Sequence, residues 1–152
     1  MGEFLKIRQK KEEIGKAAEL EIIEYEKERL SQFPRLAEKI EHTAIKNVAA
    51  GYDIKSFEGK LNESANGVPK YIEVKAVSIW DYGFNWTRNE IEKAKLYKGN
   101  YYIYLLPVVG KNRFDLKGLR IIRDPYKNIY KNKNEWVRTE ELLGFSLSEG
   151  SE

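Results

Sequence analysis

The sequence predicts an α+β domain in which a mixed β-sheet is flanked by helices. Three observations lead to this prediction. The segments follow the order helix, three strands, helix and two strands; the 152 residues suit one domain; and a hydrophobic content of 41% suffices for one core. We therefore expect residues 1–152 to form a single domain, with a core over about residues 11–123 and flexible ends at residues 1–10 and 146–152.

The first part of the chain predicts two helices and then two strands. Residues 11–31 are rich in Ala, Leu, Ile, Glu and Lys and contain no Pro, which favours a long helix that ends before Pro34. A second, short helix is expected over residues 35–41. Residues 43–48 and 52–57 are expected to be neighbouring strands, because turn residues separate them.

The second part predicts a hairpin strand, a capped helix and two more strands. Residues 70–78 alternate apolar and polar residues, which is typical of a half-buried strand, and they would pair with the strand before them. Thr87 and Glu90 have the spacing of a capping box, so we expect a helix that begins there and stops at Gly99. The remaining expected elements are strands over residues 100–109 and 116–122 and a short helix over residues 139–143.

Composition excludes several classes of chemistry. The chain has no Cys and a single His, His42, so it lacks a disulfide framework, thiolate zinc ligands and a nucleophile activated by a His base. We assign no role to His42. The net charge of only +3 does not indicate a uniformly positive surface for binding anions. No membrane helix or signal peptide is recognisable, so we expect a cytoplasmic protein without a membrane partner.

Acidic residues and a lysine on neighbouring strands predict a metal site. Glu73 and Lys75 would share one face of their strand, because side chains at i and i+2 point the same way. Asp53 opens the preceding strand, and if the two strands pair, its carboxylate converges with that of Glu73 on one cation. Two carboxylates suit Mg²⁺, which takes few protein oxygens and keeps its water ligands. Lys75 would then hold or deprotonate the water that attacks a phosphodiester.

Each of these residues also has a purely structural interpretation. Glu73 and Lys75 could be a solvated ion pair worth only ~0.5 kcal/mol. Glu19 lies on the same stripe of the long predicted helix as Ile22 and Glu26. It either supplies a third carboxylate to the metal or marks the edge of a wide amphipathic face.

Contacts with nucleic acid are expected around this site. Asn89 and Arg88 fall in the first turn of a predicted helix, whose positive end favours phosphate. Glu90 is explained as the capping-box acid, with a direct catalytic role as the alternative. Four aromatic residues before the helix either stack on bases or pack at the edge of the core: Trp80, Tyr82, Phe84 and Trp86. Lysines and an arginine that either contact phosphates or are merely solvated are Lys55, Lys60, Lys70, Arg88, Lys127, Lys131 and Lys133.

The order of a helical acid, Asp53 and Glu73-Val74-Lys75 resembles the PD-(D/E)XK nuclease superfamily, although Tyr52 stands where the superfamily name has Pro. Over roughly residues 12–110 the chain also resembles the NO VEIN carboxy-terminal domain family. The motifs that carry this resemblance are Gly15–Glu19, Tyr25–Glu26, Arg29–Leu30, Gly51–Ser56, Ile72–Lys75, Thr87–Glu90, Ala94 and Tyr101–Tyr104.

The resemblance implies a restriction-endonuclease-like core and a metal-dependent DNA endonuclease, the nuclease domain of a restriction system. It implies that Mg²⁺, or Mn²⁺ as its substitute, is held by Asp53, Glu73 and the carbonyl of Val74, with Lys75 at the water and Glu19 as the helical acid. The alternatives are a structure-specific nuclease of the Holliday-junction type and a non-catalytic nucleic-acid-binding module. Recognition or motor domains would belong to a longer chain or a separate subunit, and cutting both DNA strands would favour a homodimer.

Overall fold

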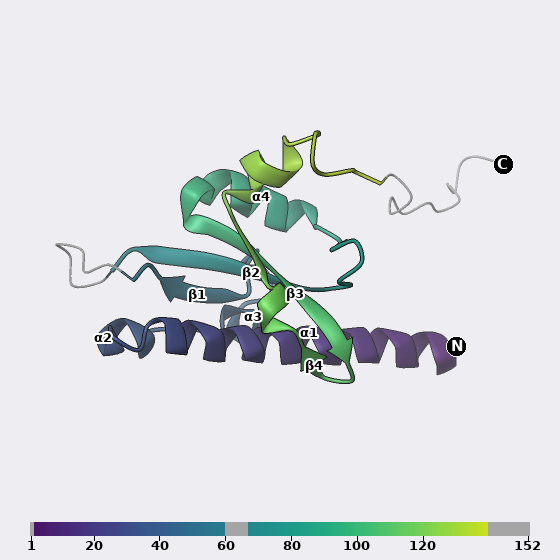
Figure 1. Ribbon diagram of the computed structural model, residues 1–152, viewed down its shortest axis with the longest axis horizontal. Helices are drawn as coiled ribbons and strands as arrows, with labels where there is room; N and C mark the ends of the chain where they lie inside the picture. Colours follow the sequence, from purple (N-terminus) through teal and green to yellow (C-terminus); the bar gives the residue numbers. More distant parts are fainter. Residues whose placement is uncertain (1, 60–66, 140–152) are drawn as a thin grey trace.

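The computed structural model describes residues 2–59 and 67–139 and confirms an α+β fold (Figure 1). The helices are α1 (Gly2–Arg29), α2 (Pro34–Ala37), α3 (Thr43–Lys46) and α4 (Arg88–Tyr97). The strands are β1 (Ile54–Phe57), β2 (Pro69–Val77), β3 (Tyr101–Gly110), β4 (Arg113–Phe114) and β5 (Arg120–Arg123). Short helical turns are η1 (Lys98–Asn100), η2 (Leu116–Gly118) and η3 (Tyr126–Tyr130).

Among the described residues, five strands form one mixed sheet in the order β1-β2-β3-β4, with β5 paired to β3. β1 and β2 form an antiparallel hairpin in which Ile54 lies opposite Ile72. β2 and β3 are parallel, because α4 returns the chain to the starting end of the sheet. The predicted hairpin and the predicted mixed sheet are therefore confirmed.

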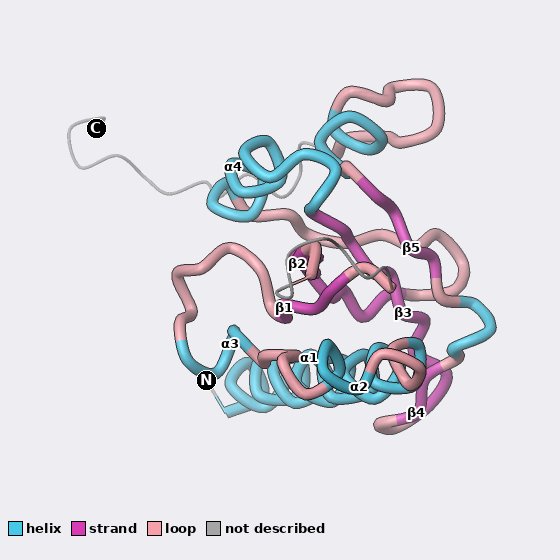
Figure 2. The backbone as a smooth tube through the Cα atoms, turned by 90° about the vertical axis from the view of Figure 1, so that its left-hand side faces the viewer, coloured by secondary structure: helices cyan, strands magenta, loops and turns pink. Residues whose placement is uncertain are grey.

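Helices cover both faces of the sheet (Figures 1 and 2). α1 lies along one face, where Ile22 belongs to the same buried cluster as Ile72 and Val74. α4 and η3 lie over the other face, where Ala94 and Ile129 join a second buried cluster. β3 runs between the two layers and its residues 101–107 are all buried, which explains a continuous apolar run instead of alternation.

Helix α1 is longer than predicted. It begins at Gly2 and ends at Arg29, so residues 2–10, expected to be a flexible end, form its first turns. The extension has a simple cause: residues 2–10 contain no Pro and are mostly good helix formers. Among the described residues, no helix has both the length and the apolar character needed to span a bilayer.

The prediction of a strand over residues 43–48 is wrong. Thr43–Lys46 forms the short helix α3, and the contact with the free side of β1 is an isolated bridge between Glu41 and Lys55, before this segment. The β-branched residues that suggested a strand are largely exposed, Ile45 at 68% and Val48 at 93%. No sheet face is available to bury these side chains, so β-propensity does not decide the local structure.

Three smaller boundaries also differ. The second predicted helix ends at Ala37 rather than residue 41. The strand predicted over residues 52–57 begins at Ile54. The segment predicted as one strand over residues 116–122 divides into η2 and β5, because Asp115 caps a helical turn by accepting a hydrogen bond from the Lys117 amide. Lys60, residues 140–143 of the last predicted helix and the end at residues 146–152 lie outside the described residues.

A buried ionic cluster ties α1 to the sheet. The carboxylate of Glu26 is fully buried and accepts hydrogen bonds from Arg29 at 2.6 and 2.9 Å, from the Ser56 hydroxyl at 2.7 Å and from the Tyr104 hydroxyl at 2.8 Å. The ammonium of Lys70 donates to the Tyr104 hydroxyl at 2.5 Å and lies 3.9 Å from Glu26. These bonds outweigh the effect of burial and hold the pKa of Glu26 below its ordinary value.

Both interpretations of Lys70, a phosphate contact and a solvated side chain, are wrong. Lys70 lies opposite Ser56 in the β1–β2 register, on the sheet face that α1 covers, and it is only 5% exposed. Burial lowers its pKa to about 8, although the neighbouring Glu26 acts in the opposite direction. The residue is therefore part of the interior.

Candidate functional site

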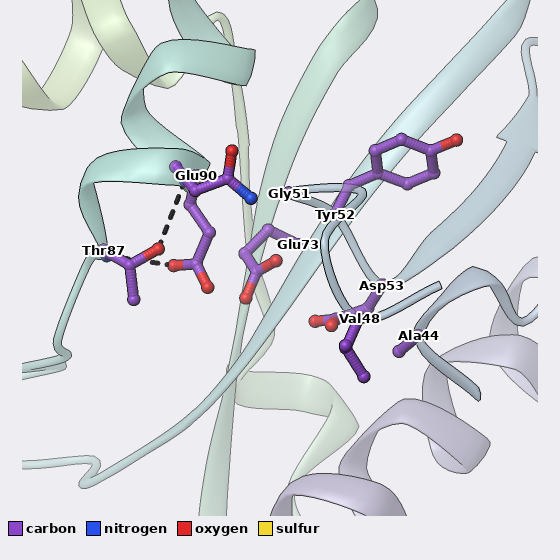
Figure 3. Close-up of a pocket in the computed structure, with 9 residues that line it drawn as sticks. Ala44, Val48, Gly51, Tyr52, Asp53, Glu73, Thr87 and Glu90 are labelled. Carbon is purple, nitrogen blue, oxygen red and sulfur yellow. Dashed lines mark hydrogen bonds between the residues drawn. The ribbon is translucent and has the colours of Figure 1, made fainter. Parts of the chain in front are cut away.

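A cleft of about 340 Å³ opens between the loop that precedes β1 and the start of α4. Three carboxylates line it: Asp53, Glu73 and Glu90. Figure 3 shows Asp53 on one side, Glu90 at the start of α4 on the other, and Glu73 between them. Sequence reasoning selected all three residues, and the fold brings them together.

Strand pairing explains how Asp53 and Glu73 meet. Ile54 lies opposite Ile72 in the hairpin, so Asp53, one residue earlier, lies beside Glu73 on the sheet face that α4 covers. The Asp53 carboxylate is fixed there, because its Oδ2 accepts a hydrogen bond from the Val74 amide at 2.8 Å.

Burial and a neighbouring carboxylate raise the pKa of each acid. The pKa of Asp53 is raised to about 6, first by burial and then by the charge of Glu19. The pKa of Glu73 is raised well above its ordinary value, first by burial and then by the charge of Asp53. The cleft therefore holds two carboxyl groups that resist joint ionisation unless a cation lies between them.

Lys75 is a charged ammonium in this site. Its Nζ lies 2.8 Å from Glu90 Oε1 and 3.2 Å from Glu73 Oε2. Burial acts to lower the pKa of Lys75, but the two carboxylates outweigh burial and raise it above its ordinary value. Of the two roles expected from the sequence, the geometry favours holding a water molecule over deprotonating it.

Glu90 is the capping-box acid of α4 and also contacts the ammonium of Lys75. Its amide donates to the Thr87 hydroxyl at 3.2 Å and its Oε1 accepts from the Thr87 amide at 3.2 Å, so the predicted capping box is confirmed. The same Oε1 accepts the hydrogen bond from Lys75. One carboxylate oxygen therefore caps α4 and orients the ammonium.

The loop that delivers Asp53 is clamped against α4 and β3. The side-chain amide of Asn89 donates to the carbonyl of Ala49 at 3.0 Å, and the buried hydroxyl of Tyr101 donates to the carbonyl of Gly51 at 2.7 Å. Asn89, expected to contact phosphate, is thus engaged by this loop. Sequence reasoning missed the function of Tyr101, and the only signal for it was its place in the motifs that carry the family resemblance.

Gly51→Ala is expected to destabilise the protein by about 1–3 kcal/mol. Gly51 has φ +81°, and a Cβ atom there would lie 2.4 Å from Cγ of Lys93. Urea unfolding followed by circular dichroism measures the effect. Gly15→Ala is the matched control: the added methyl meets nothing within 4 Å in helix α1, so equal or greater stability is expected. An unchanged urea midpoint for Gly51→Ala would contradict the clamp.

Comparison with known families adds an independent observation. A family model described as "Protein NO VEIN, C-terminal" matches residues 18–121. The chain belongs to this family. The match confirms the resemblance inferred from the sequence and spans the carboxylates, the lysine and the clamped loop. Comparisons of this NO VEIN C-terminal domain with curated proteins and with solved structures find no significant match.

In the NO VEIN C-terminal domain, Glu19 of α1 is paired with His42. Its Oε1 lies 2.6 Å from Nε2 of His42, the residue to which the sequence assigned no role. Its charge reaches Asp53, whose pKa it raises, but its side chain does not line the cleft. Local sequence spacing could not predict the contact between Glu19 and His42, because these residues are 23 positions apart and meet only through packing.

The fold places the other expected DNA contacts of the NO VEIN C-terminal domain in separate regions. Lys55 lies opposite Tyr71, on the sheet face that carries Glu73 and Lys75. Arg88 is exposed at the first residue of α4. Basic residues of the carboxy-terminal stretch that are exposed are Lys127, Lys131 and Lys133.

The donor set of the NO VEIN C-terminal domain suits a hard divalent cation. Within residues 2–59 and 67–139, no group of three or more His, Asp or Glu side chains is arranged to hold a metal ion. Asp53 and Glu73 instead offer a pair, while Glu90 is engaged by Lys75. Mg²⁺ is bound in this way, by one or two carboxylates with water in its other positions. The residues present therefore fit Mg²⁺.

Asp53→Asn is expected to stabilise the metal-free domain at pH 7.5 by about 2 kcal/mol. Because the pKa of Asp53 is raised to about 6 in the fold, its favourable contribution is complete below pH ~4 and is lost as the pH rises through 6. Thermal unfolding in chelator at pH 5 and pH 7.5 measures the difference. Glu24→Gln, at an exposed carboxylate of α1, is the control. An equal loss of stability with pH in wild type and Asp53→Asn would refute the expectation.

Proposed function

We propose that this NO VEIN C-terminal domain is a metal-dependent DNA endonuclease of the PD-(D/E)XK type, with a restriction-endonuclease-like core. One observation carries the proposal: Asp53 and Glu73 lie side by side in one cleft, and the ammonium of Lys75 lies 3.2 Å from Glu73. Two carboxylates and one lysine gathered on one sheet face suit hydrolysis of a phosphodiester and need neither Cys nor a His base.

Asp53, Glu73 and the Val74 carbonyl would hold the cation. Asp53 is held in place by the Val74 amide. The N–H and C=O of a strand residue point to the same neighbouring strand, so the Val74 carbonyl is directed to the side where Asp53 lies. Mg²⁺ bound there would supply a Lewis acid for the phosphodiester and lower the pKa of a water ligand.

Lys75 would orient the attacking water and offset negative charge at the phosphate. Its pKa is raised by Glu73 and Glu90, so it donates hydrogen bonds and does not accept the proton of the water. Arg88 at the start of α4 and Lys55 on the same sheet face would hold the flanking phosphates. Target choice would fall to recognition or motor domains in a longer chain or a separate subunit of a restriction system.

Metal uptake and cleavage test the proposal together. Calorimetric titration with Mg²⁺ or Mn²⁺ is expected to show binding by wild type and loss of binding by Glu73→Gln. Plasmid, modified phage DNA and a four-way junction are then incubated with either metal or with chelator. Metal-dependent cutting supports an endonuclease and ranks the substrates, the junction identifying a structure-specific enzyme. If neither carboxylate-dependent metal uptake nor DNA cutting is observed, the proposal is overturned in favour of a non-catalytic binding module.

A further inference from the structure

We propose that residues 126–138, together with Lys95 of α4, form a second DNA-binding surface that holds backbone phosphates of a duplex beside the cleft. We call these residues the basic face. The inference rests on the proposed nuclease function for the path of the DNA, and it names the part of the substrate that is held outside the cleft. Three observations carry it: where the positive charge lies, how the cations are held, and where the segment packs.

The cleft itself lacks the cations that DNA requires. Among the described residues that line it are three carboxylates, those of Asp53, Glu73 and Glu90, and no Lys or Arg. Lys75 is already engaged by two of these carboxylates. Much of the affinity of a protein for a duplex comes from Lys and Arg side chains that displace counterions from phosphates. Cations outside the cleft must therefore hold a strand whose phosphate lies at the carboxylates.

The positive charge of the chain is concentrated in the basic face. Residues 126–138 contain four Lys and Arg against one acid, a net charge of +3, which equals that of the whole chain, so the other 139 residues carry no net charge. The four cations are exposed: Lys127, Lys131, Lys133 and Arg138. Within residues 2–59 and 67–139, no ion pair uses any of them. Their charge is available to an external anion.

Stacked tyrosines hold several of these cations in place. The rings of Tyr126 and Tyr130 are nearly parallel, with centroids 5.1 Å apart. Nζ of Lys131 lies 5.3 Å and Nζ of Lys95 lies 5.7 Å from the centroid of Tyr126. The guanidinium of Arg138 lies 5.0 Å from the centroid of Tyr130. Cation–π contacts position these side chains without neutralising them, so less side-chain freedom is lost when a phosphate binds.

The basic face adjoins the end of α4 that forms one wall of the cleft. The ring of Tyr130 lies 6.4 Å from that of Trp86, and Trp136 lies 5.9 Å from Phe84. Phe84 and Trp86, expected to stack on bases or to pack, therefore pack. Trp86 directly precedes Thr87, which lines the cleft (Figure 3). Because a DNA strand continues on both sides of the phosphate that is cut, its neighbouring phosphates would reach the basic face.

The salt dependence of duplex binding tests the inference. A labelled duplex is titrated in chelator at 50–200 mM KCl with wild type and with the triple variant Lys127→Gln/Lys131→Gln/Lys133→Gln. The variant is expected to bind about 10–30-fold more weakly at the lowest salt, and its slope of log K against log[salt] should be smaller by about 2–3. Its circular dichroism and its uptake of Mg²⁺ should match wild type, because none of the three residues lines the cleft.

Lys6→Gln/Lys10→Gln/Lys11→Gln is the matched control. These lysines are exposed in the first turns of α1, which covers the opposite face of the sheet from α4 and η3 (Figures 1 and 2). The control removes the same net charge, so it separates the place of the cations from their number. Its duplex affinity is expected to change less than about twofold.

The outcomes separate this inference from the nuclease proposal. If both triple variants bind the duplex with equal affinity and equal salt slope, the inference is overturned, whereas metal-dependent cutting by wild type would still uphold the nuclease. If only the variant of the basic face loses affinity while wild type neither takes up Mg²⁺ nor cuts DNA, the nuclease proposal fails and the DNA-binding surface is upheld. Absence of duplex binding by wild type would overturn the inference outright.

Discussion

Lys75→Met is expected to reduce metal-dependent DNA cleavage by about 10²–10³-fold, while the protein remains folded and still takes up Mg²⁺. Met has nearly the length of Lys without its charge, so the variant removes the donor and leaves the space filled. Asp53 and Glu73 keep their positions, because strand pairing and the Val74 amide hold them without help from Lys75. Rates of plasmid nicking and calorimetric metal titration on the same preparation measure the two properties.

Lys117→Met is the control for this variant, because Lys117 is exposed in η2 and is predicted to have no part in the site. Lys75→Arg separates charge from shape: it keeps the positive charge but changes the geometry of the donors, so an intermediate rate is expected. Cleavage by Lys75→Met at the wild-type rate would show that the ammonium balances the charge of Glu73 and Glu90 without assisting the reaction.

Glu26→Ala is expected to lower the free energy of unfolding by about 3–5 kcal/mol. The substitution leaves Arg29 partly buried and Lys70 buried without their carboxylate, and it removes the acceptor of the Ser56 and Tyr104 hydroxyls. Since a domain of this size has only about 5–15 kcal/mol of stability, the variant should be close to unfolding at 37 °C. Urea titration at 15 °C measures the loss.

Glu28→Ala, an exposed acid on the same helix, serves as the reference and is expected to change stability by less than about 0.5 kcal/mol. The double variant Glu26→Leu/Lys70→Met removes both charges and should recover part of the stability, because no buried charge is left unpaired except that of the partly exposed Arg29. A loss below about 1 kcal/mol for Glu26→Ala would show that water compensates the remaining cations.

The two acidic sites of the domain respond to pH in opposite directions. The pKa of Glu26 is below its ordinary value, so its contribution to stability is present above pH ~4.5 and is lost as the pH falls. The pKa values of Asp53 and Glu73 are raised, so their cost grows as the pH rises. The direction of the pH dependence therefore distinguishes Glu26, whose charge stabilises the fold, from Asp53 and Glu73, whose charges destabilise it.

Local patterns predicted much of the fold and the centre of the site. The capping box located α4, and alternation along β2 placed Glu73 and Lys75 on one face. Antiparallel pairing with β1 then sufficed to bring in Asp53. These features depend on residues that are near in sequence or on one hairpin, where periodicity and capping carry the information.

Contacts between distant segments were not predictable from local patterns. Asn89 and Ala49 are 40 residues apart, and only the docking of α4 beside the loop makes their hydrogen bond. Lys70 has the sequence context of a surface lysine, but its partner Glu26 comes from α1, which α2, α3 and β1 separate from β2 along the chain. The formation of α3 is a similar case. Ile45 favours a strand, but no sheet face buries its side chain, and strand propensity alone does not contain that information.

The shared oxygen of Glu90 links the first turn of α4 to the ammonium of the cleft. Helix ends open more readily than strands in the middle of a sheet, with free energies well below that of global unfolding. Each opening of this turn releases Lys75 from one of its two anchors while the sheet beneath stays intact. On warming, the cleft should therefore lose its arrangement at temperatures where the rest of the fold still persists, so that heat inactivation precedes melting.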